Sequence, residues 1–197
     1  MATSAVAICN LALARIGVSS TIASLTESSQ EALACTAVYE QARDEVLRDF
    51  PWPFARRYVA LGLVEEDPND DWGYSYRYPS DCIRALRIVS GDPSGNPRIP
   101  YQIGHDDSGR LLFTDEADVQ LVYIARFTDP VHFDATFASA LGWRIAVDIA
   151  APLARSDSQR ERAEAGYRQA LAQARVDALN EEVEAAPAEA SWIRDRE

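Results

Sequence analysis

The first fifty residues carry apolar positions with the period of an α-helix. The first stretch repeats them at spacings of three and four, on one helix face: Val6, Cys9, Leu13 and Ile16. Thr3 or Ser4 precedes the stretch as an N-cap, and Gly17 follows it as a typical C-terminal residue. The pattern predicts a helix that runs to Gly17.

A second helix is predicted after a Ser- and Thr-rich linker, residues 18–27. Ser28 and Glu31 have the spacing of a capping box. One apolar stripe follows: Cys35, Tyr39, Ala42 and Val46. The helix is expected to end before Pro51, because neither this proline nor Pro53 can continue it.

The pattern then changes to short runs rich in β-branched and aromatic residues. The runs are 57–64, 74–78, 83–89, 101–105, 110–114 and 119–127. Residues 106–109 form a glycine-containing turn between two of them, which predicts a hairpin. Short strands in succession predict a small antiparallel sheet or flattened barrel.

A helical pattern returns after residue 129. Asp134 is expected to cap a helix from Ala135 to about Ala154 that is apolar nearly all round. Such a helix lies at the centre of a bundle or at a subunit interface. Its two interior charges, Arg144 and Asp148, are four residues apart, so we predict that they pair.

A last helix is predicted from Ser156, which has capping spacing to Gln159, to about Glu184. Its inner stripe is made mostly of small residues: Ala163, Tyr167, Ala170, Ala174 and Ala178. Small residues let helices approach each other closely. Pro187 then begins a short tail.

Two helices thus precede the strands and two follow them. We expect an α+β fold, a four-helix bundle formed by both chain ends with an inserted small antiparallel β domain. The N-terminal helical hairpin of the bundle covers 1–54, the β insert 55–128, the C-terminal helices 129–186, and the tail 187–197.

Charge and composition narrow the function classes. The net charge is −12, and all 19 basic residues are arginine. Nucleic-acid binders usually carry a basic patch, so this balance argues against one. We find no apolar window of about 18 residues and no basic leader, so we expect neither a membrane span nor a signal peptide.

Three cysteines without CxxC spacing argue against a disulfide framework and against a metal site. Cys9 and Cys35 lie among alanines on helical patterns and are predicted to be small buried residues. The chain also lacks glycine-rich phosphate-binding motifs. We therefore expect no cofactor and no metal ligand.

Candidate catalytic groups are few. His105 beside Asp106, Asp107 and Ser108 comes nearest to a triad, but adjacent residues in a turn cannot form that geometry. Tyr74, Tyr76 and Tyr78 share one face of a strand and could stack on bases or sugars, although one side of a small core is the more ordinary interpretation. We expect no catalytic residue.

Acidic residues concentrate in two segments of the β region. They are Glu65, Glu66, Asp67, Asp70, Asp71, Asp106 and Asp107. Glycoside hydrolysis would need two carboxyls held across a cleft, whereas these lie in predicted polar loops. If identical subunits formed a ring with these loops inward, the negative lumen would let DNA slide without sticking. The alternative is a solvated acidic face.

Several segments, in this order and spacing, carry a resemblance to a known family. They are Ile8–Gly17 with Ile22 and Leu25, Ala37–Tyr39, Arg43–Leu47, Trp52–Arg57 with Leu61, Trp72–Tyr74, Tyr78–Cys82 with Arg84, Phe137–Leu141, Ala150–Leu153, Tyr167 and Ser191–Arg194. Over nearly its whole length the chain resembles the head–tail adaptors of tailed bacteriophages, also called tail tubular protein A in short-tailed phages.

The resemblance implies a helical bundle bearing an antiparallel β domain, and a structural role in the virion. Members form a homo-oligomeric ring of about twelve subunits beneath the portal protein. The ring continues the DNA channel without specific binding and receives the tail nozzle or the next tail component. The implied location is the head–tail junction, after synthesis in the bacterial host cytoplasm. Subunits would pack side by side through helix faces that include Trp143.

The resemblance also implies that the C-terminal tail inserts against the portal. That role falls on Ser191, Trp192, Ile193, Arg194 and Arg196. A tryptophan anchor with flanking arginines is typical of interface hot spots. The alternative is a frayed chain end.

Two other function classes stay open. Some longer tail tubular proteins have been credited with sugar cleavage, so a tail-associated glycan hydrolase is one alternative. An acidic DNA-mimic regulator is the other, although a mimic would spread its acids over a whole face. We expect a virion assembly protein and not an enzyme.

Overall fold

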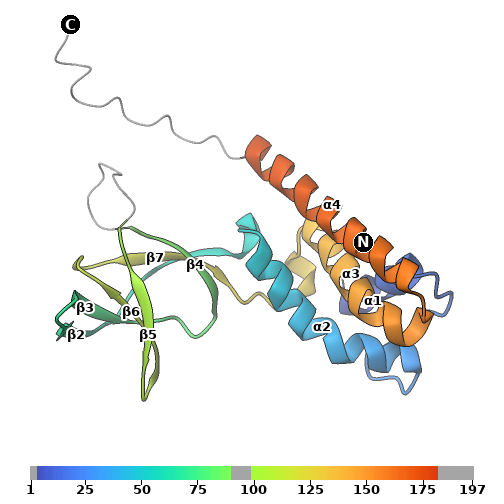
Figure 1. The fold of residues 1–197 in the computed structure, drawn as a ribbon, viewed down its shortest axis with the longest axis horizontal. Coiled ribbons are helices and arrows are strands. Elements are labelled where there is room, and N and C mark those ends of the chain that lie inside the picture. Colours follow the sequence, from blue (N-terminus) through green and yellow to red (C-terminus); the bar gives the residue numbers. More distant parts are fainter. Residues whose placement is uncertain (1–3, 90–98, 182–197) are drawn as a thin grey trace, which may run out of the picture.

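The computed structural model describes residues 4–89 and 99–181 (Figure 1). Within these ranges the chain forms four α-helices and seven strands in two antiparallel sheets, so the fold is α+β as expected. The helices gather at one end of an elongated molecule and the strands at the other.

Helix α1 (Ala5–Arg15) lies where the sequence predicts it. Ser4 is the N-cap, and its Oγ accepts a hydrogen bond from the Ala7 N–H at 3.1 Å. Gly17 follows the helix with a φ of +79°, a conformation that glycine adopts without a Cβ penalty. The Val18 N–H then donates to the Leu13 carbonyl, which ends the helix.

Helix α2 (Gln30–Asp49) begins one residue later than its predicted cap. The predicted capping box of Ser28 and Glu31 is wrong, because Ser29 is the N-cap and accepts from the Ala32 N–H at 3.3 Å. Glu27 instead closes the preceding loop by accepting from two backbone N–H groups. The predicted stripe is buried: Cys35, Tyr39, Ala42 and Val46.

Helix α3 (Ala135–Ile149) starts at its predicted cap, where Asp134 accepts from the Thr136 N–H at 2.6 Å. It is shorter than predicted, since Ala150–Ala154 form a turn of π-helix that contains Pro152. Proline has no N–H to continue the α-helical ladder. The predicted pair of Arg144 and Asp148 is confirmed at 2.7 Å.

Helix α3 is the centre of the helical part and packs against α1, α2 and α4 (Asp157–Glu181). The segment Ala135–Ala154 is long and apolar enough to cross a membrane, with a mean hydropathy of 1.3 over its 18-residue window. The expectation that no such window exists is therefore wrong. Half of the window is buried inside the structure, and central packing accounts for its apolar character.

The strands form two sheets in place of the single small sheet or barrel expected. The three-stranded sheet has the order β1 (Arg56–Ala60), β7 (Gln120–Ala125), β4 (Cys82–Val89). The four-stranded sheet has the order β2 (Leu63–Asn69), β3 (Trp72–Arg77), β6 (Gly109–Thr114), β5 (Gln102–Asp106). The predicted run 57–64 divides between them at Leu61 and Gly62. The predicted hairpin is β5–β6.

Strand β2 contains acids that the sequence places in a loop. Glu65, Glu66 and Asp67 extend the apolar run as β-structure, paired with β3. The pairing is irregular, with register shifts after Leu63 and after Glu66, and Asp67 has a φ of +49°. The sequence did not predict this part of the strand, because most side chains of β2 are exposed and several are acidic.

Two hydrophobic cores organise the molecule. The larger core lies among the helices and takes in Trp52, which precedes β1, with Ile83 of β4 and Ile124 of β7. The smaller core draws on both sheets: Tyr76, Tyr78, Cys82, Ile88, Leu112, Val119, Leu121, Tyr123 and Ala125. The three-stranded sheet therefore belongs to both cores.

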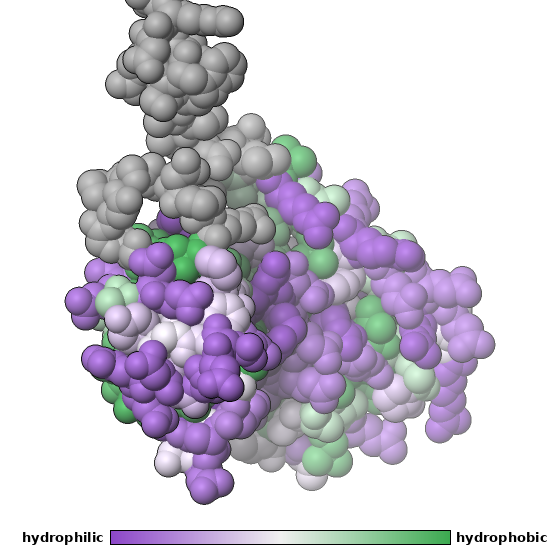
Figure 2. Space-filling model, turned by 60° about the vertical axis from the view of Figure 1, so that its left-hand side comes forward, coloured by the Kyte–Doolittle hydropathy of each residue, from purple (hydrophilic) through white to green (hydrophobic). Residues whose placement is uncertain are grey.

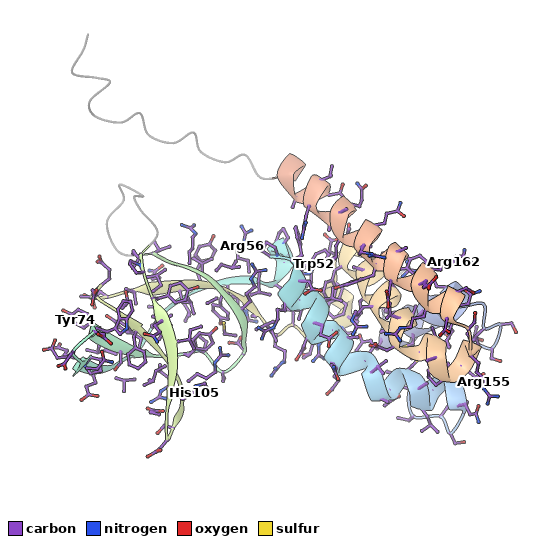
Figure 3. All side chains as sticks on the ribbon, viewed as in Figure 1. Trp52, Arg56, Tyr74, His105, Arg155 and Arg162 are labelled. Carbon is purple, nitrogen blue, oxygen red and sulfur yellow. The ribbon has the colours of Figure 1, made fainter. Side chains whose placement is uncertain are left out.

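Trp52 lies where the helical and β parts meet (Figure 3). Its ring packs edge-on against Phe137 at 5.1 Å and Phe50 at 4.9 Å between centroids. Its indole N–H donates to the Val46 carbonyl at 2.7 Å. The tryptophan thus ties the end of α2 to α3 at the point where the chain enters β1.

Polar contacts also join α2 to the three-stranded sheet. Asp44 accepts from Arg43 and from Arg126, each at 2.8 Å. Arg84 in β4 donates to the Arg48 carbonyl at 3.0 Å. These bonds hold the sheet against the C-terminal half of α2.

Candidate functional site

One group of acids gathers at the end of the four-stranded sheet where β2 turns into β3. Asp70 and Asp71 lie exposed in this turn, which the Asn69 side chain closes by accepting from two backbone N–H groups. Asp115 joins them, because its Oδ1 accepts from the Gly73 N–H at 3.0 Å. Glu65, Glu66 and Asp67 line β2 just before the turn and are also exposed.

The second predicted acidic segment lies at the opposite end of the same sheet. Asp106 and Asp107 occupy the β5–β6 turn, where Asp106 accepts two hydrogen bonds from Arg77, each at 2.8 Å. These bonds lower the pKa of Asp106 to about 2. Arg77 therefore neutralises Asp106.

The predicted lumen-facing acids thus form two separate groups. Strands β3 and β6 pair Tyr74 with Thr114 and Arg77 with Leu111, so the two turns lie a strand length apart. No ion pair within residues 4–89 and 99–181 involves the acids of 65–71. Five of the seven predicted carboxylates therefore form one group of negative charge at one end of the sheet.

The histidine candidate does not form a triad. His105 is exposed in β5, paired across the hairpin with Arg110 (Figure 3). Asp106 Oδ1 accepts from the Ser108 N–H at 2.9 Å, the local bond of an ordinary turn. Asp106 and Ser108 therefore belong to the turn, and His105 belongs to strand β5.

The tyrosine row belongs to a core and not to a stacking platform. Tyr76 is 2% exposed and Tyr78 is 5% exposed, and Tyr74 packs against the same core. The Tyr76 hydroxyl donates to the Glu116 carbonyl, and the Arg110 guanidinium covers the Tyr78 ring at 4.1 Å. Neither ring offers an open face of the size that a base or sugar needs.

The cysteines are buried, as predicted for Cys9 and Cys35. The Cys9 thiol on α1 is influenced by the neighbouring Cys35 side chain on α2, which together with burial raises the pKa of Cys9. In the described part of the chain no three His, Cys, Asp or Glu side chains are grouped to hold a metal ion.

A groove of about 480 Å³ lies between the two sheets near the β5–β6 turn. Its walls come from residues 59–62, 77–80 and 108–110. Arg77 and Arg110 line it, but Arg77 is bound to Asp106 and Arg110 lies over Tyr78. Residues 59–62 form one wall of the groove, and they lie within a run of the chain, 58–64, that exposes several apolar side chains.

The exposed apolar side chains of this run, which belong to β1 and β2, are a feature that the sequence pattern did not single out. Four large apolar side chains are solvent-exposed within seven residues: Tyr58 at 58%, Val59 at 36%, Leu63 at 51% and Val64 at 42%. Figure 2 shows the β part from its outer side, where apolar residues interrupt a mostly hydrophilic surface. The available signal was the lack of apolar–polar alternation across 58–64, which leaves apolar side chains on both faces.

The helix face expected to join subunits is partly covered by the chain itself. The Arg15 guanidinium lies 4.0 Å over the Trp143 ring, and Gly166 of α4 lies directly against the same ring. Arg144 bonds to Glu45 and Asp148, and the Tyr167 hydroxyl donates to Asp49 at 2.7 Å. Trp143 and Arg144 therefore join α3 to its neighbours within one subunit.

The predicted docking residues Ser191, Trp192, Ile193, Arg194 and Arg196 lie outside the described residues. The last described residue of α4 is Glu181. Helix α4 runs along the outside of the helical part, and its described end lies near the β part (Figure 1).

The chain was compared with known proteins. No protein-family model matches it, and a search of curated proteins found no match.

Proposed function

We propose that this chain is a virion structural protein, the ring-forming adaptor that binds beneath a phage portal and provides the platform for the tail. The observation that carries the proposal is the ordered series of segments, spread along the chain, that resembles the head–tail adaptors. We further propose that the four helices from both chain ends act as one bundle and that the strands form its protruding domain.

The positions of those segments support the proposal. Asn10, within the first segment, binds the Ile22 backbone, and Trp52, within the Trp52–Arg57 segment, fills the core between the parts. Asp44, which Arg43 also binds, forms the polar contact between α2 and Arg126 at the end of β7. The resemblance thus rests on residues that hold the helical and β parts together, which is where a shared architecture would be maintained.

The distribution of charge supports a passive contact with DNA. The unpaired acids of residues 65–71 face solvent at one end of the β part, so a ring that turned this end inward would repel phosphate. In the proposed role DNA passes through the channel and the protein does no chemistry. Its partners are the portal protein, the tail nozzle or next tail component, and eleven or so further copies of itself.

Portal binding is the direct test. The full chain and a truncation that ends at Ala190 are each mixed with the portal protein of the same phage and run on size-exclusion chromatography with light scattering. The proposal expects a large complex with the full chain and loss of that complex on truncation, because the tail docks on the portal. Trp192→Ala alone is expected to weaken the complex by about tenfold or more.

Matched controls separate docking from folding. Circular dichroism of the truncation must match the full chain, so that loss of the complex reports docking and not folding. Val176→Ala, an exposed change on α4, is expected to leave the complex intact. Absence of a complex with the full chain overturns the proposal, and hydrolysis of a glycan by the isolated protein would favour the enzymatic alternative instead.

A further inference from the structure

Strands β1 and β2, which carry the exposed apolar side chains, are also edge strands of their sheets. Strand β1 pairs only with β7 among the described residues, and β2 pairs only with β3. Each of these two strands therefore has one backbone edge without a partner strand among the described residues. Edges of this kind are ready to pair with another strand, and soluble proteins usually protect them.

Protection is present on only part of this edge. Pro68 lacks an N–H, and the irregular pairing around Asp67 bends the strand away from a regular ladder. Before Glu65 the edge contains no proline and no buried charge, and its irregularity is the register shift between Leu63 and Glu65. This stretch carries the exposed side chains of Leu63 and Val64.

The opposite edge of the four-stranded sheet is the complementary surface. Strand β5 pairs only with β6 among the described residues, and Ile103 on it is 38% exposed. All neighbours in this sheet are antiparallel, and the sheet has four strands. Its two edge strands, β2 and β5, therefore run in opposite directions.

The even number of strands decides how a second copy fits. A copy placed alongside by a rotation that preserves strand direction brings its β2 antiparallel to β5 of the first. The sheet then continues across the boundary with the same alternation, and the growing assembly keeps one free β2 at one end and one free β5 at the other until the ring closes. The three-stranded sheet cannot do this, because its edges β1 and β4 run in the same direction.

We propose that β2 of one copy pairs with β5 of the next, with Leu63 and Val64 contacting Ile103 across the boundary. Such a head-to-tail contact uses two different surfaces and generates a ring when the rotation closes. The inference rests on the proposed function for the existence of the ring, and it assigns the surface that builds it. Each contact is small, but a closed ring multiplies weak contacts.

Thiol crosslinking tests the pairing directly. Two variants, Leu63→Cys and Ile103→Cys, are mixed in equal amounts and treated with a short bismaleimide, which tolerates uncertainty in register. The native cysteines are buried and do not compete. The inference expects a crosslinked dimer from the mixture and none from either variant alone, while the double variant gives a ladder of higher oligomers.

The matched control is Leu33→Cys, a change at a leucine on α2 that is at least as exposed as Leu63. Mixed with Ile103→Cys it is expected to give no crosslink. A second measurement uses Leu63→Asp, which places an unpaired charge in the contact and is expected to weaken self-association by about tenfold or more. Leu33→Asp is expected to leave self-association unchanged.

The outcomes separate this inference from the proposed function. A dimer from Leu63→Cys alone would mean that β2 pairs with β2, and it would overturn the inference. A monomer at the highest soluble concentration, with no crosslink from the mixture either alone or on the portal, would overturn it as well. Crosslinking without portal binding would leave the inference standing and refute the adaptor role, whereas portal binding without the crosslink would do the reverse.

Discussion

Asn10 and Ile22 hold each other through two hydrogen bonds. Asn10 Nδ2 donates to the Ile22 carbonyl at 2.9 Å, and the Ile22 N–H donates to Asn10 Oδ1 at 2.8 Å. The pair fastens α1 to the loop that leads to α2 and places the Ile22 side chain in the larger core.

Asn10→Ala is expected to destabilise the protein by about 1–3 kcal/mol, because the Ile22 N–H and carbonyl lose their partners in a partly buried place. Urea unfolding followed by circular dichroism measures the change. Gln41→Ala is the control, because the Gln41 side chain is exposed and bonds to Glu45 on its own helix. An unfolding midpoint equal to that of the wild type would contradict the role assigned to Asn10.

Gly166→Ala is expected to lower the free energy of unfolding by about 1–3 kcal/mol. A Cβ at this position would lie 2.6 Å from the Trp143 ring, so the ring must move and its contact with Arg15 must loosen. A shift in tryptophan fluorescence should accompany the change. Gly62→Ala, where an added Cβ meets nothing within 4 Å, should change neither quantity by as much.

Asp106 is expected to titrate far below its ordinary value. Arg77 lowers its pKa from 3.8 to about 2, so the folded state binds fewer protons than the unfolded state in that range. Any contribution of the pair to stability is therefore present above about pH 4 and is lost as the pH falls toward 2. Carboxyl chemical shifts in NMR spectra follow the titration. In Arg77→Gln the midpoint should return toward 3.8, and an unchanged midpoint would refute the cause given.

The three thiols are expected to react slowly in the folded protein. Burial raises the pKa of Cys82, and the neighbouring Cys35 together with burial raises the pKa of Cys9, so little thiolate forms at these two positions. Cys9 lowers the pKa of Cys35, and burial is what shields this third thiol from the reagent. A colorimetric thiol reagent at mildly alkaline pH should react at least about a hundredfold faster after denaturation. If one thiol per chain reacted rapidly in the native protein, that thiol would be accessible, which would contradict the prediction.

Charge reversal at the acidic end should create DNA binding. The wild type is expected to leave duplex DNA free at moderate salt, whereas Asp70→Arg with Asp71→Arg should bind it in a salt-dependent way. Fluorescence anisotropy of labelled DNA provides the measurement. Glu40→Arg with Glu161→Arg changes the net charge equally on the helical part. Equal binding by the two double variants would mean that net charge, and not position, excludes DNA.

The helices could be predicted because their signals are local. Ser4 and Asp134 cap α1 and α3 as the sequence indicates, since a cap depends on residues two or three positions away. The wrong cap predicted for α2 also comes from a local signal. Two neighbouring serines, Ser28 and Ser29, are both suitable caps by residue type, and Ser29 is the one that caps the helix, while Glu27 binds backward into the loop.

The arrangement of the strands could not be predicted in the same way. The run 57–64 looks like one strand, yet its first half pairs with β7, sixty or more residues away, and its second half pairs with β3. That division leaves the run exposed on both faces. The same long-range pairing sends Asp70 and Asp106 to opposite ends of one sheet, which no spacing in the sequence indicates.

The central position of α3 has a consequence for how the protein is made. Arg15 on α1 donates to the Ser139 carbonyl and hydroxyl, a contact between residues 124 positions apart. On the ribosome the N-terminal helices therefore emerge long before the helix that completes their core. They must wait through the synthesis of all seven strands, and a nascent chain halted before residue 135 leaves their apolar faces open to chaperones.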